Sequence, residues 1–399
     1  MTDGIVRLFD LPENVYVKVE GSYLSHIFQL ILSKTKTISN LIKETGIPRM
    51  QLYKMYNGKY VSLKVIKLLS VWIKKNIDNH FKKSEIEIHI DSIKTPYTGN
   101  EIFKPRFPMN FKNANGATII SAFLHDGCIS RKFETSYGNT NKEARKALIR
   151  SLMKCVGRVY HNNSTKELKF PKILGIILVH GLKLPCGNKV DNNVKIPEFL
   201  QNGSEKMKRR FLKIVFDDEG CVDPHPTSHH VSMSLTSKEN KPSNLLSGNK
   251  KLLEDVGIVV SGPYLVGTHI TKTGLKRYHW QIKIEDYKSL KLFKEKINFY
   301  SSMKKELLES VLNSYKRIQL PKKELKKIVL KCFHEIESST GFVTTNMLAE
   351  KLGKSKGWCR TLVKRFQSDG LIKVVEYETH TNYGSTPRKY VSNHTLLTL

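Results

Sequence analysis

The sequence predicts an α+β fold whose central part repeats one pattern of helices and strands. Two segments, 119–127 and 212–220, share one design: an apolar run with helical spacing ends in an acidic residue and a glycine. The two acids, Asp126 and Glu219, lie 93 residues apart. Each segment is followed by further stretches with strand or helix periodicity. We therefore expect two similar α+β halves between smaller flanking modules.

Residues 1–76 are predicted to form a helical module, because apolar residues recur at helical spacing in four stretches. Residues 37–54 have the helix, glycine turn and helix of a helix-turn-helix. Gly46 supplies the corner, since glycine adopts positive φ without steric penalty. This segment resembles the Cro/repressor group. Its recognition helix would present four side chains to DNA: Arg49, Gln51, Tyr53 and Lys54.

Residues 77–110 are predicted to be a connector. The stretch 86–91 alternates between apolar and polar residues like a strand, and three prolines follow it. We expect this strand to join the neighbouring domain.

The two central repeats are predicted at 111–205 and 206–318. In the first, 128–141 alternates like a pair of strands, 142–156 has helical spacing, and 168–179 reads as a strand or short helix. The second repeat follows the same order with three further segments: a strand at 231–237, a helix at 244–256 and a strand at 278–284.

Residues 319–399 predict a winged helix. Three helices are expected at 325–337, 345–352 and 355–368, followed by strands at 371–377 and 388–391 that flank a polar wing. The wing contains Asn382, Gly384 and Pro387. The basic and aromatic residues expected to contact DNA are Lys356, Trp358, Arg360, Lys364, Arg365, Arg388 and Lys389.

The charge of the chain favours a polyanionic partner. Its formal net charge is +31 over 399 residues, far beyond what folding requires. No stretch approaches the roughly 18 apolar residues of a membrane span, and no signal peptide is expected at the start. Six scattered cysteines support neither a zinc ribbon nor a disulfide framework. We expect an intracellular, nucleoid-associated protein that binds double-stranded DNA.

The paired acid-glycine segments resemble the LAGLIDADG motif of homing endonucleases. Their spacing is close to one αββαββα repeat of the single-chain members of that family. The stretch between the repeats also resembles the family's bridge, with Gly181, Pro185, Gly187 and Lys189 followed by Ile196-Pro and Phe199-Leu. The resemblance covers roughly 200 residues and implies a pseudo-symmetric pair of αββαββα repeats with flanking helix-turn-helix and winged-helix modules.

The resemblance also implies a catalytic site. The two motif helices would pack together, so that Asp126 and Glu219 hold Mg²⁺ or Mn²⁺ beside the scissile phosphates, while Gly127 and Gly220 end the motifs. Hard cations of this kind prefer oxygen ligands, activate water and stabilise a departing oxyanion. Lys189 and Lys304 follow the repeats where family members carry a basic residue. The implied function is a monomeric, site-specific double-strand DNA endonuclease.

The strands after each motif would form saddle-shaped sheets in the major groove. The candidate DNA contacts come from these strands, where alternate residues point one way, and which parity faces the DNA stays open. They are Arg131, Lys132, Tyr137, Asn139, His225, His230, Ser232 and Ser234. We interpret the histidines at 225–230 as a hairpin tip rather than a zinc site, since partnering cysteines are missing.

Other interpretations remain open. Each acid-glycine pair alone would also suit an ordinary helix C-terminus. A non-catalytic DNA-binding regulator derived from the same fold is the first functional alternative, although such descendants typically lose the motif acids. An RNA maturase is the second, and preference for structured RNA over duplex DNA would distinguish it. An intein is not expected, because the chain lacks its splice residues.

Overall fold

The computed structural model describes most of the 399 residues. The chain folds into two compact units, one formed by Met1–Gly220, Met233–Lys283 and Leu292–Ser302, the other by Cys221–Ser232, Ile284–Lys291 and Met303–Leu399. In the described part, no helix is both long and apolar enough to cross a membrane. The described residues are 3–96, 100–192, 194–224, 229–314, 324–376, 379–381, 384–386 and 388–393.

The N-terminal part contains the four predicted helices. Thr37 caps α2 by accepting a hydrogen bond from the Asn40 amide, and Gly46 ends that helix with a φ of +66°. The left-handed conformation expected at this corner is therefore present. The helices are α1 (Gly21–Thr35), α2 (Ile38–Thr45), α3 (Arg49–Tyr56) and α4 (Leu63–Asn76).

This part is not purely helical, however. A five-stranded antiparallel sheet, in the order β3-β2-β4-β5-β9, joins the N-terminal module, the connector and the first repeat. The connector thus adds two strands, where we expected one. The strands are β3 (Val61–Ser62), β2 (Tyr16–Val19), β4 (Ile90–Lys94), β5 (Glu101–Phe103) and β9 (Arg158–Val159).

The strand predicted at 86–91 is wrong in its first half. Residues Lys83–Ile88 form helix α5, and β4 begins only at Ile90. The Glu85 carboxylate accepts the Lys82 amide at 3.2 Å, which stabilises the first turn of the helix. A capping interaction therefore outweighs the alternating pattern.

Burial of Glu87 in α5 carries a testable consequence. The side chain is 2% exposed, its Oε1 accepts the Leu8 amide at 2.8 Å, and its Oε2 has no hydrogen-bond partner among the described residues. Burial raises the pKa of Glu87. The Glu87 carboxyl therefore holds its proton more tightly in the folded state than in the unfolded state. As pH rises from the ordinary glutamate pKa through the raised one, this contribution to folding stability is lost.

We therefore expect Glu87→Gln to stabilise the protein by about 1 kcal/mol at pH 7. The gain should vanish below the ordinary glutamate pKa, where Glu87 is protonated in both states. Thermal unfolding at pH 7 and pH 4 measures the difference. A variant equally stabilised or destabilised at both pH values would contradict this account of Glu87.

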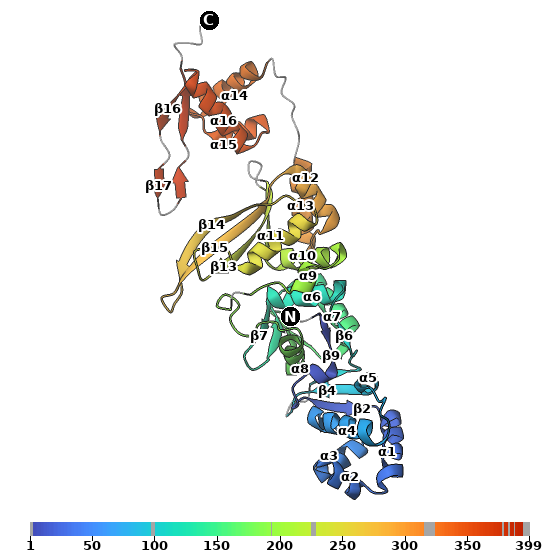
Figure 1. The fold of residues 1–399 in the computed structure, drawn as a ribbon. Coiled ribbons are helices and arrows are strands. Elements are labelled where there is room, and N and C mark those ends of the chain that lie inside the picture. Colours follow the sequence, from blue (N-terminus) through green and yellow to red (C-terminus); the bar gives the residue numbers. More distant parts are fainter. Residues whose placement is uncertain are drawn as a thin grey trace. The chain divides into compact units, whose positions relative to one another are not determined.

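The central region contains the same order of elements twice (Figure 1). Apart from the short strand β9, which follows α7 in the first half, both halves read helix, two strands, helix, two strands, helix, as the fold class predicts. The first comprises α6 (Ala114–Leu124), β7 (Gly127–Ile129), β8 (Thr135–Tyr137), α7 (Lys142–Cys155), β10 (Asn162–Asn163), β11 (Leu168–Phe170) and α8 (Lys172–Ile176). The second comprises α10 (Glu205–Asp218), β12 (Gly220–Asp223), β13 (His230–Ser237), α11 (Asn244–Asp255), β14 (Ser261–Ile270), β15 (Lys276–Ile284) and α12 (Tyr287–Lys296).

Helices α6 and α10 pack directly against each other, and the small residues of α6 allow a close approach. Ser121 is fully buried and its hydroxyl donates to the backbone carbonyl of Phe211 at 2.9 Å. Side-chain caps start both helices, from Asn113 in α6 and Ser204 in α10. Because the two helices pack side by side, the acid-glycine pairs at their C-terminal ends lie close together.

The sheet of the second repeat has the order β12-β13-β15-β14 and buries one face. Val231, Met233, Ile282 and Ile284 point into the core, whereas Lys283 and its neighbours of the same parity are partly exposed. Strand β14 was absent from the sequence prediction. Two register irregularities against β15 interrupt its alternation, which explains why periodicity missed it.

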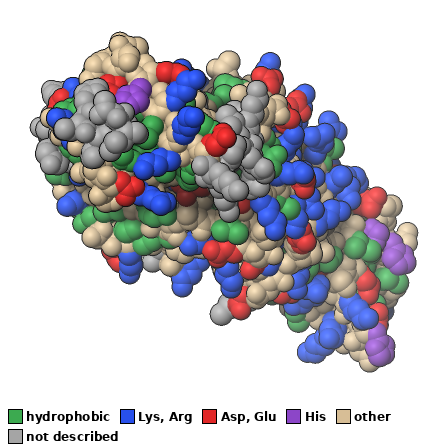
Figure 2. Space-filling model, turned by 90° about the horizontal axis from the view of Figure 1, so that it is seen from above, with side chains coloured by type: hydrophobic (Ala, Val, Ile, Leu, Met, Phe, Trp, Pro, Cys, Tyr) green, Lys and Arg blue, Asp and Glu red, His purple; other side chains and the backbone are tan. Residues whose placement is uncertain are grey.

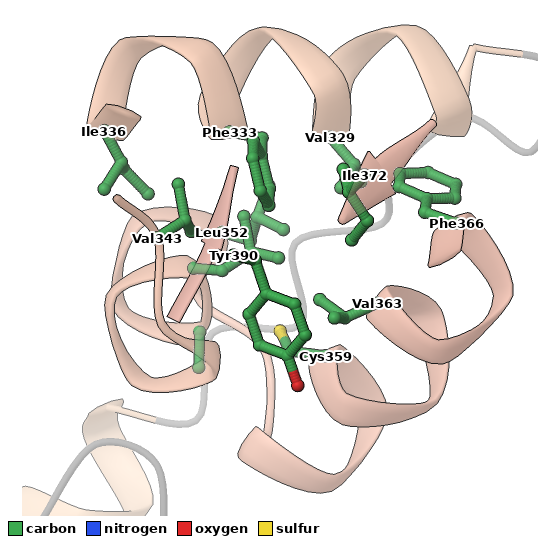
Figure 3. Packing of buried hydrophobic residues seen from close by; sticks show 12 residues of the cluster. Val329, Phe333, Ile336, Val343, Leu352, Cys359, Val363, Phe366, Ile372 and Tyr390 are labelled. Carbon is green, nitrogen blue, oxygen red and sulfur yellow. The ribbon is translucent and has the colours of Figure 1, made fainter. Parts of the chain in front are cut away.

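The C-terminal module, residues 325–393, contains three helices packed on an antiparallel strand pair. Its core combines residues of α14 (Leu325–Thr340), α15 (Thr345–Leu352) and α16 (Lys356–Ser368) with Ile372 of β16 (Ile372–Glu376) and Tyr390 of β19 (Lys389–Ser392) (Figure 3). The elements fall close to their predicted positions. Asn382 and Pro387 of the predicted wing lie outside the described residues.

Candidate functional site

The glycine of each motif is required by close packing. A Cβ on Gly127 would lie 2.6 Å from the Ala122 carbonyl oxygen, and one on Gly220 would lie 2.8 Å from Cδ1 of Phe216. Neither glycine has a positive φ, so neither is a left-handed helix cap. The backbone instead turns tightly from helix into strand at both places. This turn projects Asp126 and Glu219 from equivalent positions.

Four charged groups meet at these helix ends. Asp126 and Glu219 both act electrostatically on Asp218 and on Lys189. Asp126 is exposed, while the other three are partly buried. The structure therefore brings together three of the four predicted catalytic residues and adds Asp218, which the sequence analysis did not single out.

Asp218 is held by the opposite repeat. Its Oδ1 accepts hydrogen bonds from the Tyr137 hydroxyl and the Asn139 amide, each at 2.7 Å. Its Oδ2 is buried and has no hydrogen-bond partner among the described residues. Burial, together with the Asp126 charge, raises the pKa of Asp218 well above its usual range.

Lys189 comes from the loop between the repeats. Its ammonium group donates to the backbone carbonyl of His125, and burial lowers the pKa of Lys189 while Glu219 and Asp126 oppose that shift. The loop is held in place because the Gly187 amide donates to the Ile129 carbonyl of β7 at 2.7 Å. Lys189 thus lies where it can balance the charge of the acids.

His125 is buried in the core and also lines the cavity next to Lys189 and Glu219. It is 6% exposed, its Nδ1 lies 2.9 Å from the Ser121 carbonyl, and its Nε2 lies 3.2 Å from the Asn249 amide nitrogen. Burial lowers the pKa of His125 to about 3. The imidazole is therefore neutral at physiological pH, and its Nδ1 donates to the carbonyl.

Asp217 of the second motif makes contacts of its own, and the predicted residue Lys304 belongs to a later helix. The Asp217 carboxylate accepts the backbone amides of Tyr300 and Ser301 at 2.5 and 2.8 Å, so it ties α10 to that turn. Lys304 belongs to α13 (Ser302–Ser314), in the other compact unit. That Lys304 is a catalytic residue stays a prediction.

A cavity of about 230 Å³ opens beside Glu219. Its lining includes Glu219 and Lys189 together with Ser234 and Thr236 of β13 and Lys238 of the turn after it. The polar face of the second sheet thus leads directly to the charged cluster. A phosphate group approaching along this face would meet both cations and acids.

The carboxylate oxygens of Asp126 and Glu219 are suitable ligands for a hard divalent cation. Asp126 and Glu219 offer carboxylate oxygens, and Mg²⁺ is commonly bound by one or two carboxylates plus several waters. Among the described residues, no three His, Cys, Asp or Glu side chains form a group that could hold a metal ion. The metal therefore remains a proposal, resting on two carboxylates and water.

The predicted contacts of the first repeat divide into two groups. Arg131 and Lys132 are exposed, as a DNA contact requires. Tyr137 and Asn139 are 0% and 8% exposed and bind Asp218, so the expectation that they face DNA is wrong. Thr135 and Tyr137 both point inward from β8, and the Tyr137 hydroxyl reaches Asp218 of the second repeat.

Tyr137→Phe tests this role. Removing the hydroxyl leaves the Asp218 carboxylate with one donor fewer in a buried place, which should cost about 1–3 kcal/mol of stability. Thermal unfolding measures the loss, and Tyr160→Phe, at an exposed tyrosine, is the matched control. Equal stability of the two variants would contradict the bond to Asp218.

In the second repeat the predicted parity places Ser234 on the polar face, whereas Ser232 is buried at 3%. His230 lies 3.6 Å from the Asp223 carboxylate. His225 lies outside the described residues. The polar face also carries residues that the sequence analysis missed with β14: His269 lies 2.7 Å from His279, which in turn lies 3.1 Å from Thr236.

The terminal modules present part of their predicted contacts. Arg49 and Lys54 are exposed and Tyr53 is partly exposed, but the Oε1 atom of Gln51 is buried, so Gln51 is poorly placed to read bases. Met50, which was not predicted, is 67% exposed on this helix. That α3 binds DNA remains a prediction.

In the C-terminal module, Arg360, Lys364 and Arg365 are exposed on α16 and Lys356 is partly exposed, while Trp358 packs partly against the core. Arg388 is exposed. Lys389 forms an ion pair with Glu376 at 2.5 Å and lies over the ring of Phe342. Lys389 is thus committed to contacts within the module.

Comparisons with known proteins give weak likenesses. No family model matches the chain. The isomerizing glutamine–fructose-6-phosphate aminotransferase of Methanocaldococcus jannaschii is 25% identical over 201 residues, covering 48% of this chain. The chain spans only 16% of that relative's length. The aminotransferase activity is therefore a property of the relative and is not carried over.

Two solved structures show a distant likeness to the chain. Full-length DUF199/WhiA from Thermatoga maritima covers 65% of this chain and 91% of its own, at 12% identity and a TM-score of 0.34. The N-terminal LAGLIDADG domain of DUF199/WhiA covers 55% and 89%, at 13% identity and a TM-score of 0.27. TM-scores this low establish no common function. The α+β class rests on the elements themselves.

Proposed function

We propose that this chain is a DNA-binding protein of LAGLIDADG type, which binds duplex DNA through the polar face of its second-repeat sheet. The main supporting observation is that this sheet has one buried apolar face and one polar face. The polar face leads to the cavity that Glu219 and Lys189 line. Strands β14 and β15 are long, and a two-stranded ribbon fits the major groove. The net charge of +31 supports a polyanionic partner.

Basic side chains are available to hold the DNA backbone. On the face seen in Figure 2, Lys and Arg side chains are spread among fewer Asp and Glu side chains. Phosphate contacts of this kind position a protein, whereas contacts to base edges specify the sequence. Tyr264 and Gln281 lie opposite each other on β14 and β15 with the outward parity, so they are candidates for base contacts.

Tyr264→Ala with Gln281→Ala tests this surface. We expect the double variant to lose about 10- to 100-fold in affinity for a preferred duplex, since each good base contact contributes about 1–3 kcal/mol. Binding to unrelated duplexes should change less than twofold. Fluorescence anisotropy at fixed salt measures both, and Tyr160→Ala is the control. Equal losses on all duplexes would contradict base recognition by this sheet.

A second candidate function is endonucleolytic cleavage, favoured by the presence of both motif acids with Lys189. In this proposal Asp126 and Glu219 hold a divalent cation, which when bound supplies an activated water and stabilises the leaving oxygen. Lys189 balances the charge that develops at the phosphate. Binding without cleavage would leave a non-catalytic regulator.

A further inference from the structure

A basic groove lies on α10 away from the acids. Its open volume is about 580 Å³, and six of its nine lining residues are basic while one is acidic. Lys206, Arg209, Arg210 and Lys213 recur at helical spacing along one side of α10. The opposite wall is formed by Lys294, Glu295, Lys296, Ile297 and Asn298.

The groove is built from ordered contacts. Arg209 Nε donates to the Lys296 carbonyl at 2.6 Å, and Lys296 Nζ donates to the Val256 carbonyl at 2.9 Å. Arg210 donates to the Tyr300 hydroxyl at 2.5 Å, and Lys213 lies 4.7 Å from the centre of the same ring. The cations are thus arranged around a fixed aromatic side chain.

Acidic neighbours compensate only part of this charge. Glu205 lies 3.0 Å from Lys296 and 4.0 Å from Arg209, and Glu295 is the one acid that lines the groove. An excess of cations remains along α10. Such an excess destabilises the fold through repulsion unless an anion binds it.

The first repeat shows that the fold does not require these charges. At the spacing of the two motifs, the counterparts of Lys206, Arg209, Arg210 and Lys213 are Asn113, Gly116, Ala117 and Ile120. Gly116, Ala117 and Ile120 are buried, and the backbone of Phe111 covers Gly116. The equivalent surface is therefore covered in one repeat but open and basic in the other.

The groove is also separated from the acids along the helix. Lys213 and Lys206 precede Glu219 by 6 and 13 residues. At the rise of an α-helix these are about 9 and 20 Å along the axis. They also lie on the side of α10 away from Phe211, which packs against α6.

We propose that this groove binds the phosphodiester backbone of a second duplex DNA segment, separate from the one at the acid cluster. Arginine pairs bidentately with phosphate and lysine acts as a point charge, so the mixed row fits a phosphate chain. The inference rests on the proposed DNA-binding function. It adds that one protein molecule bridges two duplexes.

The test is capture of a second duplex. Full-length protein is bound to a bead-attached duplex, and retention of a fluorescent duplex is measured across a salt series. The groove variant carries Lys206→Gln, Arg210→Gln and Lys213→Gln. The matched control carries Lys142→Gln, Lys146→Gln and Lys154→Gln on α7, with the same change in charge. Glutamine preserves helix propensity.

The native protein and the control should retain the second duplex, and the groove variant should retain at least tenfold less while binding the first duplex within twofold. The inference would be overturned if the groove variant retained the second duplex as well as the native protein does. It would also be overturned if the native protein bound the first duplex but retained no second one. Displacement by polyglutamate but not by competing duplex would overturn it in favour of an acidic protein partner. Failure of native protein to bind the first duplex would instead reject the proposed function.

Discussion

Gly220→Ala should destabilise the second repeat by more than about 3 kcal/mol, the upper end of what overpacking usually costs. The added Cβ would lie 2.8 Å from Cδ1 and 2.9 Å from Cα of Phe216, and closer still to the Phe216 carbonyl oxygen. That oxygen is backbone, so it cannot move without distorting α10. Phe216 itself is buried against Phe293 at 4.8 Å between ring centres. Thermal unfolding followed by circular dichroism measures the loss.

Gly267→Ala is the matched control, because no atom beyond the residue itself and its two chain neighbours lies within 4 Å of the added Cβ. This change should alter stability by no more than about 0.5 kcal/mol. Gly127→Ala should resemble Gly220→Ala, since the Ala122 carbonyl and Phe123 surround it in the same way. If the two motif variants melted like the control, the tight helix-to-strand turn would be contradicted.

Under the endonuclease candidate, Asp126→Asn and Glu219→Gln should each slow DNA cleavage by about 1,000-fold or more. A bound divalent cation is worth several kcal/mol in the transition state, and about 1.4 kcal/mol corresponds to tenfold in rate. Because both substitutions preserve size, DNA binding should change less than threefold. Cleavage of a plasmid library in Mg²⁺ or Mn²⁺ measures the activity.

Glu134→Gln is the control for these two variants, since Glu134 is an exposed carboxylate paired with Lys172. Cleavage that survives either motif substitution would reject the paired-carboxylate mechanism. Tight binding by the native protein with no cleavage in either metal would reject the endonuclease candidate and leave DNA binding as the function.

The sequence was informative where local chemistry decides the structure. Gly46 and the apolar runs before Gly127 and Gly220 predicted helices that the structure confirms. Strand β14 escaped because its irregular register against β15 breaks the alternation. Helix α5 forms where a strand was predicted, because the hydrogen bond between the Lys82 amide and the Glu85 carboxylate stabilises the helix start despite the alternating apolar pattern.

The site was predictable only in part for a similar reason. Resemblance placed Asp126, Glu219 and Lys189 together, and the structure brings them together. Asp218 was not singled out, because its partner Tyr137 lies 81 residues earlier in the chain. Tyr137 looked like an outward strand residue until packing between the repeats showed that it points inward. Contacts between distant segments leave no local signal in periodicity.

The most direct test of the central claim is selection of duplexes from a random library by the native protein, followed by affinity measurements at two salt concentrations. We expect one enriched sequence, bound at least about 1,000-fold more tightly than unrelated duplex. Affinity should fall steeply between the two salt concentrations. A library that shows no enrichment, with all duplexes bound equally, would mean that the charge alone binds DNA and would contradict recognition by the sheet.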